Sequence, residues 1–123
     1  MMAGTLLAAL SVILGAFGAH ALKTIVAADQ LLVFETAVKY QFYHCFALLA
    51  AGIAYSHYPS KLLKQATNLF IAGVACFSGS LYAMVALSTS GISLGPVGIL
   101  TPIGGLLLII GWVLFFAGIA KGK

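Results

Sequence analysis

The sequence predicts an all-α integral membrane protein, a bundle of four transmembrane helices in one domain over residues 1–123. Of its side chains, 63% are apolar and only 7% are charged, against roughly a quarter charged in soluble proteins. The charged residues also stand in groups separated by long apolar runs. These runs cover residues 2–22, 36–58, 66–89 and 101–120. Each is long enough to cross the hydrocarbon core as a helix, which takes about 20 residues. The alternative, a soluble helical core, would need polar faces that these segments lack.

The first run, 2–22, is predicted to be a retained membrane helix. A cleaved signal peptide is the alternative, because Ala19, His20 and Ala21 imitate its small-residue cleavage pattern. However, no lysine or arginine precedes the run, and the run exceeds the usual about 7–15 apolar residues. On this first helix, a side of small residues opposes a side of large ones. Lipid does not drive helices together hydrophobically, so small residues that allow close approach are predicted to face inward. The small side comprises Thr5, Ala8, Ala9, Gly15, Ala16 and Ala19.

The second run, 36–58, ends at Tyr58 and Pro59 and carries a polar stripe on one side. Tyr40, Gln41 and His44 share that side. Ionisable residues inside a membrane are costly and usually face the bundle interior, so His44 is the principal candidate for a functional residue. The alternative is a neutral histidine whose two ring nitrogens are hydrogen-bonded within the bundle.

The third and fourth runs show a similar sorting of side-chain size. On 66–89 a small side is again predicted to face inward; it comprises Ala72, Ala75, Gly79, Ala83 and Ala86. In 101–120, Gly104, Gly111 and Gly118 recur every seven residues and predict a packing seam. Threonine is a favoured residue at a helix N-cap, and proline is favoured at the first helical position after it. The fourth helix is therefore expected to start at Thr101 and Pro102.

Between the third and fourth runs, residues 88–100 carry turn chemistry and predict an extracellular connector. A short re-entrant segment is the alternative there. The stretch contains Ser90, Gly91, Ser93, Gly95, Pro96 and Gly98.

A candidate polar site within the membrane follows from these patterns. Its predicted members are His44, Tyr40, Gln41, His20, Glu35, Ser80 and Tyr82. His20, at the end of the first helix, is expected to lie near the start of the second helix. Ser80 and Tyr82 are expected to form hydrogen bonds to neighbouring helices. Glu35 and Lys39 have ion-pair spacing and are expected to anchor a helix end at the membrane interface.

No cofactor, metal ion or catalytic residue is predicted. Two histidines without further ligands do not make a metal site, and Cys45 and Cys76 match no zinc or redox spacing. The sequence has no pattern for a nucleophile, a phosphate cradle or a carboxylate dyad, so an enzyme is not expected.

The lysines predict the orientation and the partners. With both termini in the cytoplasm, Lys61, Lys64, Lys121 and Lys123 lie inside and two lysines lie outside, as positively charged loops prefer. The predicted partner is the lipid bilayer of the plasma membrane, with a further copy or another membrane protein. The net charge of +4 fits anionic headgroups and lacks the clustering that nucleic-acid binding needs.

Four motifs in order along the chain resemble the domain-of-unknown-function family 423 of small bacterial membrane proteins. They read GAFGAHAL from Gly15, FETAVKYQFYH from Phe34, FSGSLY from Phe77 and LTPIGGLLLIIGW from Leu100. The resemblance implies a plasma-membrane protein of four helices with no settled activity. It marks motif members without giving them roles, and these are His20, Glu35, Tyr40, His44, Ser80, Tyr82, Pro102 and Trp112.

Two functions are consistent with these observations. The first is a structural or accessory protein that packs with itself or within a larger membrane assembly, indicated by the small-residue faces. The alternative is a small permeation or proton-linked transport element in which the polar stripe around His44 lines a path. A membrane-embedded enzyme relying on histidine chemistry is a weaker third reading.

Overall fold

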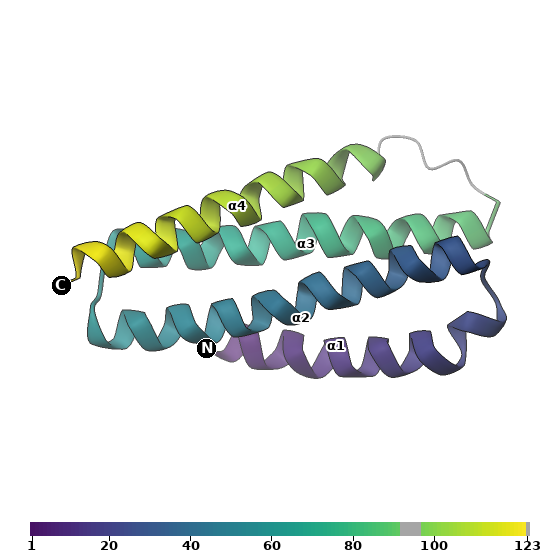
Figure 1. Ribbon diagram of the computed structural model, residues 1–123, viewed down its shortest axis with the longest axis horizontal. Helices are drawn as coiled ribbons and strands as arrows, with labels where there is room; N and C mark the ends of the chain where they lie inside the picture. The colour runs from purple at the N-terminus through teal and green to yellow at the C-terminus, as the bar shows by residue number, and fades with distance from the viewer. Residues whose placement is uncertain (92–96, 123) are drawn as a thin grey trace.

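The computed structural model describes residues 1–91 and 97–122, and these form an antiparallel row of four long helices (Figure 1). Each helix runs back along the one before it, and the two termini lie toward the same end of the molecule. The elements are α1 (Met2–His20), a short 3-10 helix η1 (Leu22–Thr24), α2 (Ala28–His57), α3 (Lys61–Thr89) and α4 (Val97–Lys121). The predicted all-α fold class with four helices is confirmed.

Three segments among the described residues are long and apolar enough to cross a membrane. They are Met2–Thr24, Lys61–Thr89 and Val97–Lys121. The helix that does not qualify is α2, whose middle contains the polar side chains Tyr40, Gln41 and His44. α2 packs lengthwise between α1 and α3. That it crosses the membrane with them stays a prediction.

Three helices begin earlier than their apolar runs predict. The second begins at Ala28 and the third at Lys61, where the Ser60 hydroxyl accepts a hydrogen bond from the Leu63 amide at 3.2 Å. The fourth begins at Val97, so the predicted start at Thr101 is wrong and Pro102 lies inside the helix. Unpaired backbone is costly in lipid, which favours a helical apolar stretch before Pro102 over an open one.

The contact between α1 and α2 depends on three small residues spaced by seven. Gly4, Ser11 and Gly18 are the buried residues of α1. A Cβ on Gly18 would lie 3.0 Å from the ring of Phe34, and one on Gly4 would lie 3.2 Å from the Cβ of Leu48. The prediction that the small side of α1 faces inward is therefore wrong for most of its members, because the buried line is displaced around the helix from that side. Its members Thr5, Ala9, Ala16 and Ala19 are exposed, and Ala8 and Gly15 are half-buried.

The glycine seam of α4 is confirmed, and it receives large side chains from α3. A Cβ on Gly111 would lie 2.9 Å from the ring of Phe70, and one on Gly118 would lie 2.9 Å from Leu63. Farther along the seam, Gly104 lies against the backbone of Phe77. Large residues spaced by seven on α3 thus fit glycines spaced by seven on α4, which allows the two backbones to approach closely.

The inward side predicted for α3 is wrong, because the five small residues predicted to face inward are exposed or half-buried, whereas most of the large residues opposite them are buried. Buried on α3 are Leu63, Phe70, Val74, Leu81 and Val85, whereas Ala72, Ala75, Gly79 and Ala86 are exposed and Ala83 is half-buried. Glycines on α4 leave the space for two of these side chains, Leu63 and Phe70. Size complementarity between helices, rather than small residues on every helix, determines which side packs.

The turns agree in part with the predictions. As expected, α2 closes at Tyr58 and Pro59, with Tyr58 as its capping residue. At the far end of α3, Gly91 has φ +67°, the left-handed conformation in which glycine commonly ends a helix. Of the predicted connector, Ser93, Gly95 and Pro96 lie outside the described residues, and so does the proposed re-entrant alternative.

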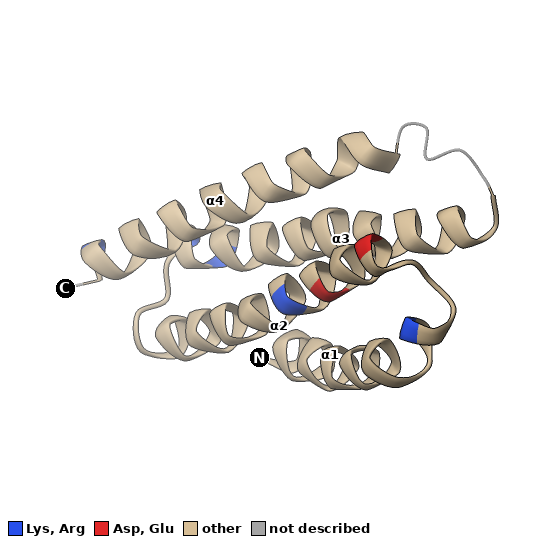
Figure 2. Cartoon of the chain, turned by 45° about the vertical axis from the view of Figure 1, so that its right-hand side comes forward, with Lys and Arg blue, Asp and Glu red and all other residues tan. Residues whose placement is uncertain are grey.

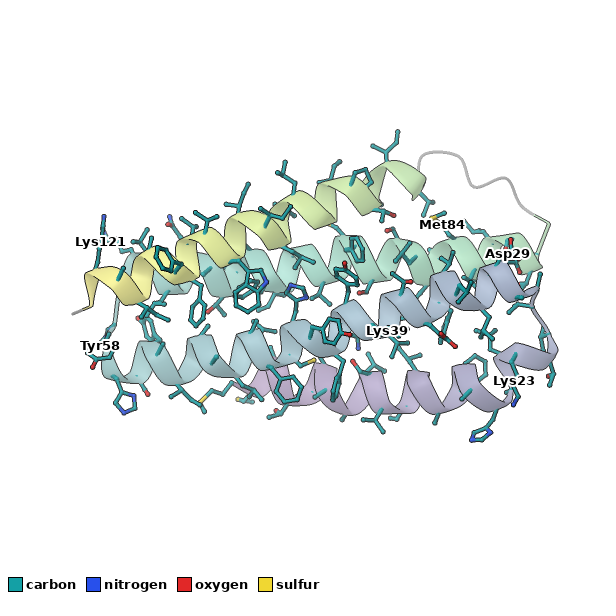
Figure 3. All side chains as sticks on the ribbon, in the orientation of Figure 1. Lys23, Asp29, Lys39, Tyr58, Met84 and Lys121 are labelled. Carbon is teal, nitrogen blue, oxygen red and sulfur yellow. The ribbon has the colours of Figure 1, made fainter. Side chains whose placement is uncertain are left out.

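Most charged residues lie toward the two ends of the bundle, with two exceptions on α2 (Figure 2). Because Gly118 packs on Leu63, Lys121 lies at the same end as Lys61 and Lys64. Lys23 and Asp29 lie at the other end, as Figure 3 shows. The exceptions are Lys39, which lies between the two ends (Figure 3), and Glu35, four residues before it. The remaining lysine of the orientation argument, Lys123, is outside the described residues.

Candidate functional site

His44 lies in the interior of the bundle with both ring nitrogens hydrogen-bonded. Its side chain is 5% exposed. Nε2 is 3.2 Å from the indole Nε1 of Trp112 on α4, and Nδ1 is 2.7 Å from the backbone oxygen of Tyr40. An indole nitrogen only donates, so Nε2 accepts and the proton resides on Nδ1, which donates to Tyr40. The two contacts therefore select one neutral tautomer.

Aromatic rings surround this imidazole. Phe70 and Trp112 have ring centroids 5.7 and 6.1 Å from that of His44, and they contact each other edge to face at 5.2 Å. The Tyr40 ring stacks at 6.3 Å, nearly parallel to the imidazole. His44 thus lies among aromatic rings, and both of its ring nitrogens have hydrogen-bond partners.

Gln41 joins three helices from a buried position on α2. Its Nε2 donates to the backbone oxygen of Leu7 on α1 at 3.0 Å, and its Oε1 accepts from the hydroxyl of Tyr82 on α3 at 3.1 Å. A second bond between α2 and α3 runs from the Ser78 hydroxyl to the backbone oxygen of Ala37 at 2.8 Å. These bonds satisfy polar groups that lipid would leave unpaired, and they fix the register of α1, α2 and α3.

Ser80 takes part in a separate contact between α3 and α4. Its Oγ is 2.7 Å from Oγ1 of Thr101 and 2.9 Å from the backbone oxygen of Phe77. Ser80 has one hydroxyl proton, which it donates to Phe77, so Thr101 donates to Ser80. Thr101 thus connects two helices where the sequence suggested a capping role.

The predicted site residues therefore fall into separate contacts. His44 and the backbone of Tyr40 form one, Gln41 and Tyr82 a second, and Ser80 a third. Glu35 lies on the surface 3.9 Å from Lys39, and His20 is exposed at the end of α1. Within the described part of the chain, His20 joins none of these bonds.

Two members of these contacts were not predicted from side-chain patterns. Trp112, the partner of His44, was marked only by the resemblance, and Thr101 was assigned to a helix start. The sequence does contain an indication that Trp112 donates a hydrogen bond. Trp112 follows Gly111 of the packing seam, and an indole N–H inside a protein usually finds an acceptor.

The buried polar side chains have their hydrogen-bond partners within the bundle. Within residues 1–91 and 97–122, every buried side-chain nitrogen and oxygen has a hydrogen-bond partner. In the same residues, no cluster of three histidine, cysteine, aspartate or glutamate side chains is placed to hold a metal ion. The bonds of His44, Gln41, Ser78 and Ser80 to neighbouring helices show that the arrangement can connect helices.

Comparison with known proteins gives a consistent set of relatives. The family described as protein of unknown function (DUF423) matches residues 14–105. The UPF0382 membrane protein SSP2132 of Staphylococcus saprophyticus is 42% identical over 96% of this chain and 93% of its own length. The UPF0382 membrane protein YwdK of Bacillus subtilis is 38% identical over 96% and 93%. The UPF0382 inner membrane protein YgdD of Escherichia coli is 33% identical over 91% and 82%. No solved structure matches the chain.

Proposed function

This chain belongs to the DUF423 family of bacterial multi-pass membrane proteins, and from that premise we propose that it is a structural or accessory component of a membrane assembly. In this role it acts by helix packing, either with further copies of itself or with another membrane protein. The bilayer is its solvent, and its helices supply the contact surfaces.

The observation that carries the proposal is the exposed small-residue face of α3. Ala72, Ala75, Gly79 and Ala86 are all exposed, and a Cβ added at Gly79 would meet nothing within 4 Å. Association of helices in lipid depends on close backbone contact through such residues. A face of this kind that the described residues leave exposed supports a role in packing against another helix.

The state of His44 supports packing over the transport alternative. A proton-linked path would need an imidazole nitrogen that exchanges partners with water or with a transported ion. Both nitrogens of His44 are instead bonded within the bundle, to Tyr40 and Trp112.

For the location we propose the plasma membrane, with both termini in the cytoplasm. The Escherichia coli relative is described as an inner membrane protein. Lys61, Lys64 and Lys121 share one end of the bundle, so that end supplies the larger positive charge that cytoplasmic loops favour.

The test is self-association and partner capture with a bulky side chain placed on the α3 face. Gly79→Leu should weaken association in mild detergent and in cross-linked membranes, while the helices still form. Gly98→Leu on α4 is the matched control, because a Cβ there also meets nothing within 4 Å, and it should associate as the unsubstituted chain does.

Two results would overturn the proposal. One is an unsubstituted chain that runs only as a monomer and captures no membrane protein. The other is a proton or ion flux in reconstituted vesicles that His44→Ala abolishes while the fold survives, which would favour transport.

A further inference from the structure

If α2 crosses the membrane as predicted, Glu35 and Lys39 lie at the depth of the membrane core. The predicted helix 36–58 would place them at its end, but α2 begins at Ala28, about two turns before Glu35. The depth of Lys39 follows from its neighbours. Tyr40, the next residue, has its ring 4.6 Å from that of Phe77, and Phe77 is only two residues past the middle of the 29-residue α3.

This depth does not suit a helix-end anchor. Two residues correspond to about 3 Å along a helix, whereas the hydrocarbon core extends about 15 Å to either side of its middle. On the other side of α2, Val38 lies 3.6 Å from the Cβ position of Gly15, which is inside the apolar span of α1. A lysine at the centre of a span cannot reach the headgroups in the way that lysines near helix ends do.

Both charges point out of the bundle. The side chains of Lys39 and Glu35 are 62% and 45% exposed, and their ion pair is loose at 3.9 Å. Ionisable side chains at membrane depth almost always face a bundle interior or a water-filled cavity. Among residues 1–91 and 97–122, these two face neither, which favours a protein surface that covers them.

Resting on the proposed packing function, we propose that the outward face of α2 around Glu35 and Lys39 is the contact surface for a second copy of this chain. Each Glu35 then pairs with Lys39 of the second copy, and each Lys39 with its Glu35. The resulting four-charge cluster lies away from the lipid.

Charge complementarity selects a second copy as the occupant. A two-fold contact places the same patch on both sides, so the patch must complement itself. One acidic and one basic residue, a helical turn apart, meet that condition. An unrelated partner would have to supply both opposite charges at the same depth.

The shape of the surface is consistent with a helix docking there. Between α1 and α2 runs a groove of about 120 Å³, with Gly15, Gly18 and Ala19 on its α1 side and Glu35 and Lys39 on α2. Small residues along one wall allow close approach of another backbone.

Aromatic residues continue the same face of α2. Phe42 and Phe46 contact each other edge to face at 5.1 Å, and Phe46 is 57% exposed. Exposed aromatic side chains of this kind supply contact area in interfaces.

The experiment uses charge reversal in two differently tagged full-length copies expressed together. Glu35→Lys alone and Lys39→Glu alone place like charges against each other, so each should lose about tenfold or more of its self-capture. When the two single variants are mixed, opposite charges meet again and capture should return. The double variant E35K/K39E should associate with itself.

Asp29→Lys is the matched control, since it reverses an acidic residue at the start of α2 and should leave self-capture unchanged. If the single variants fail to insert, the double variant still tests the surface, because it restores the pairing within each contact.

The outcomes separate this inference from the proposed function. Unchanged self-capture in both single variants overturns the α2 surface but leaves packing through α3, which Gly79→Leu tests. Capture of only a different membrane protein through Glu35 and Lys39 overturns the second copy as occupant. A chain that captures nothing overturns both.

Discussion

The indole Nε1 of Trp112 donates a hydrogen bond to Nε2 of His44 at 3.2 Å, joining residues 68 positions apart in the chain. The contact connects α4 to α2 beside Phe70 of α3, whose ring lies edge to face with the indole. Three helices therefore meet at one buried histidine, whose tautomer is set by its two partners.

The first prediction concerns that tautomer. In ¹⁵N NMR spectra of the detergent-solubilised chain, His44 should carry its proton on Nδ1, because Nε2 accepts from Trp112. Trp112→Phe keeps an aromatic ring but removes the donor, and should lower the free energy of unfolding by about 1 kcal/mol. A spectrum with the proton on Nε2 would contradict the arrangement.

Gln41 and Tyr82 should behave as a coupled pair. Gln41→Leu and Tyr82→Phe each remove one side of the 3.1 Å bond, and a double-mutant cycle on unfolding free energy should give a coupling of about 0.6 kcal/mol, with about 1.7 as the upper range. Tyr43→Phe, at an exposed position on α2, is the control and should be neutral. Strict additivity of the two substitutions would show that the bond contributes nothing.

Adjacent glycines in α4 should respond oppositely to the same change. A Cβ at Gly104 would lie 2.7 Å from the Cα of Phe77, which is backbone and cannot easily move, whereas one at Gly105 would lie 3.8 Å from the Phe77 ring. Gly104→Ala should lower stability by about 1–3 kcal/mol through overpacking. Gly105→Ala should be neutral or stabilising by up to about 1 kcal/mol, as expected from helix propensity. Equal thermal-unfolding midpoints for the two variants would argue against the seam.

Thr101 should matter through Ser80 rather than through helix capping. Thr101→Val removes the hydroxyl that donates to Ser80 and should cost about 0.6 kcal/mol. The cost should vanish in a Ser80→Ala background if the bond is its cause. An equal cost in both backgrounds would instead favour a local effect on α4.

Orientation is testable with reporter fusions. Green fluorescent protein fused after Lys121 should fluoresce, because the lysine-rich end is predicted to be cytoplasmic. Alkaline phosphatase fused after Gly91, at the opposite end, should be active. The reversed pattern would place both termini outside.

The sequence by itself determined the solvent, the class of structure and part of the packing. Long apolar runs with few charges can satisfy their backbone in lipid only as helices, so four helices followed from composition and spacing. The seam of Gly104, Gly111 and Gly118 was also predictable, since a repeat of seven keeps one side of a helix in contact along its length.

Only the tertiary structure decided which side of α1 and of α3 faces inward, and which residues bond to His44, Gln41 and Ser80. Helical periodicity tells which residues share a side. In a soluble protein, the contrast with water then selects the buried side, but lipid is as apolar as leucine and supplies no such contrast. The choice falls to the fit between neighbours: Phe70 is buried because Gly111 of another helix leaves room for its ring, and no pattern within one helix contains that information.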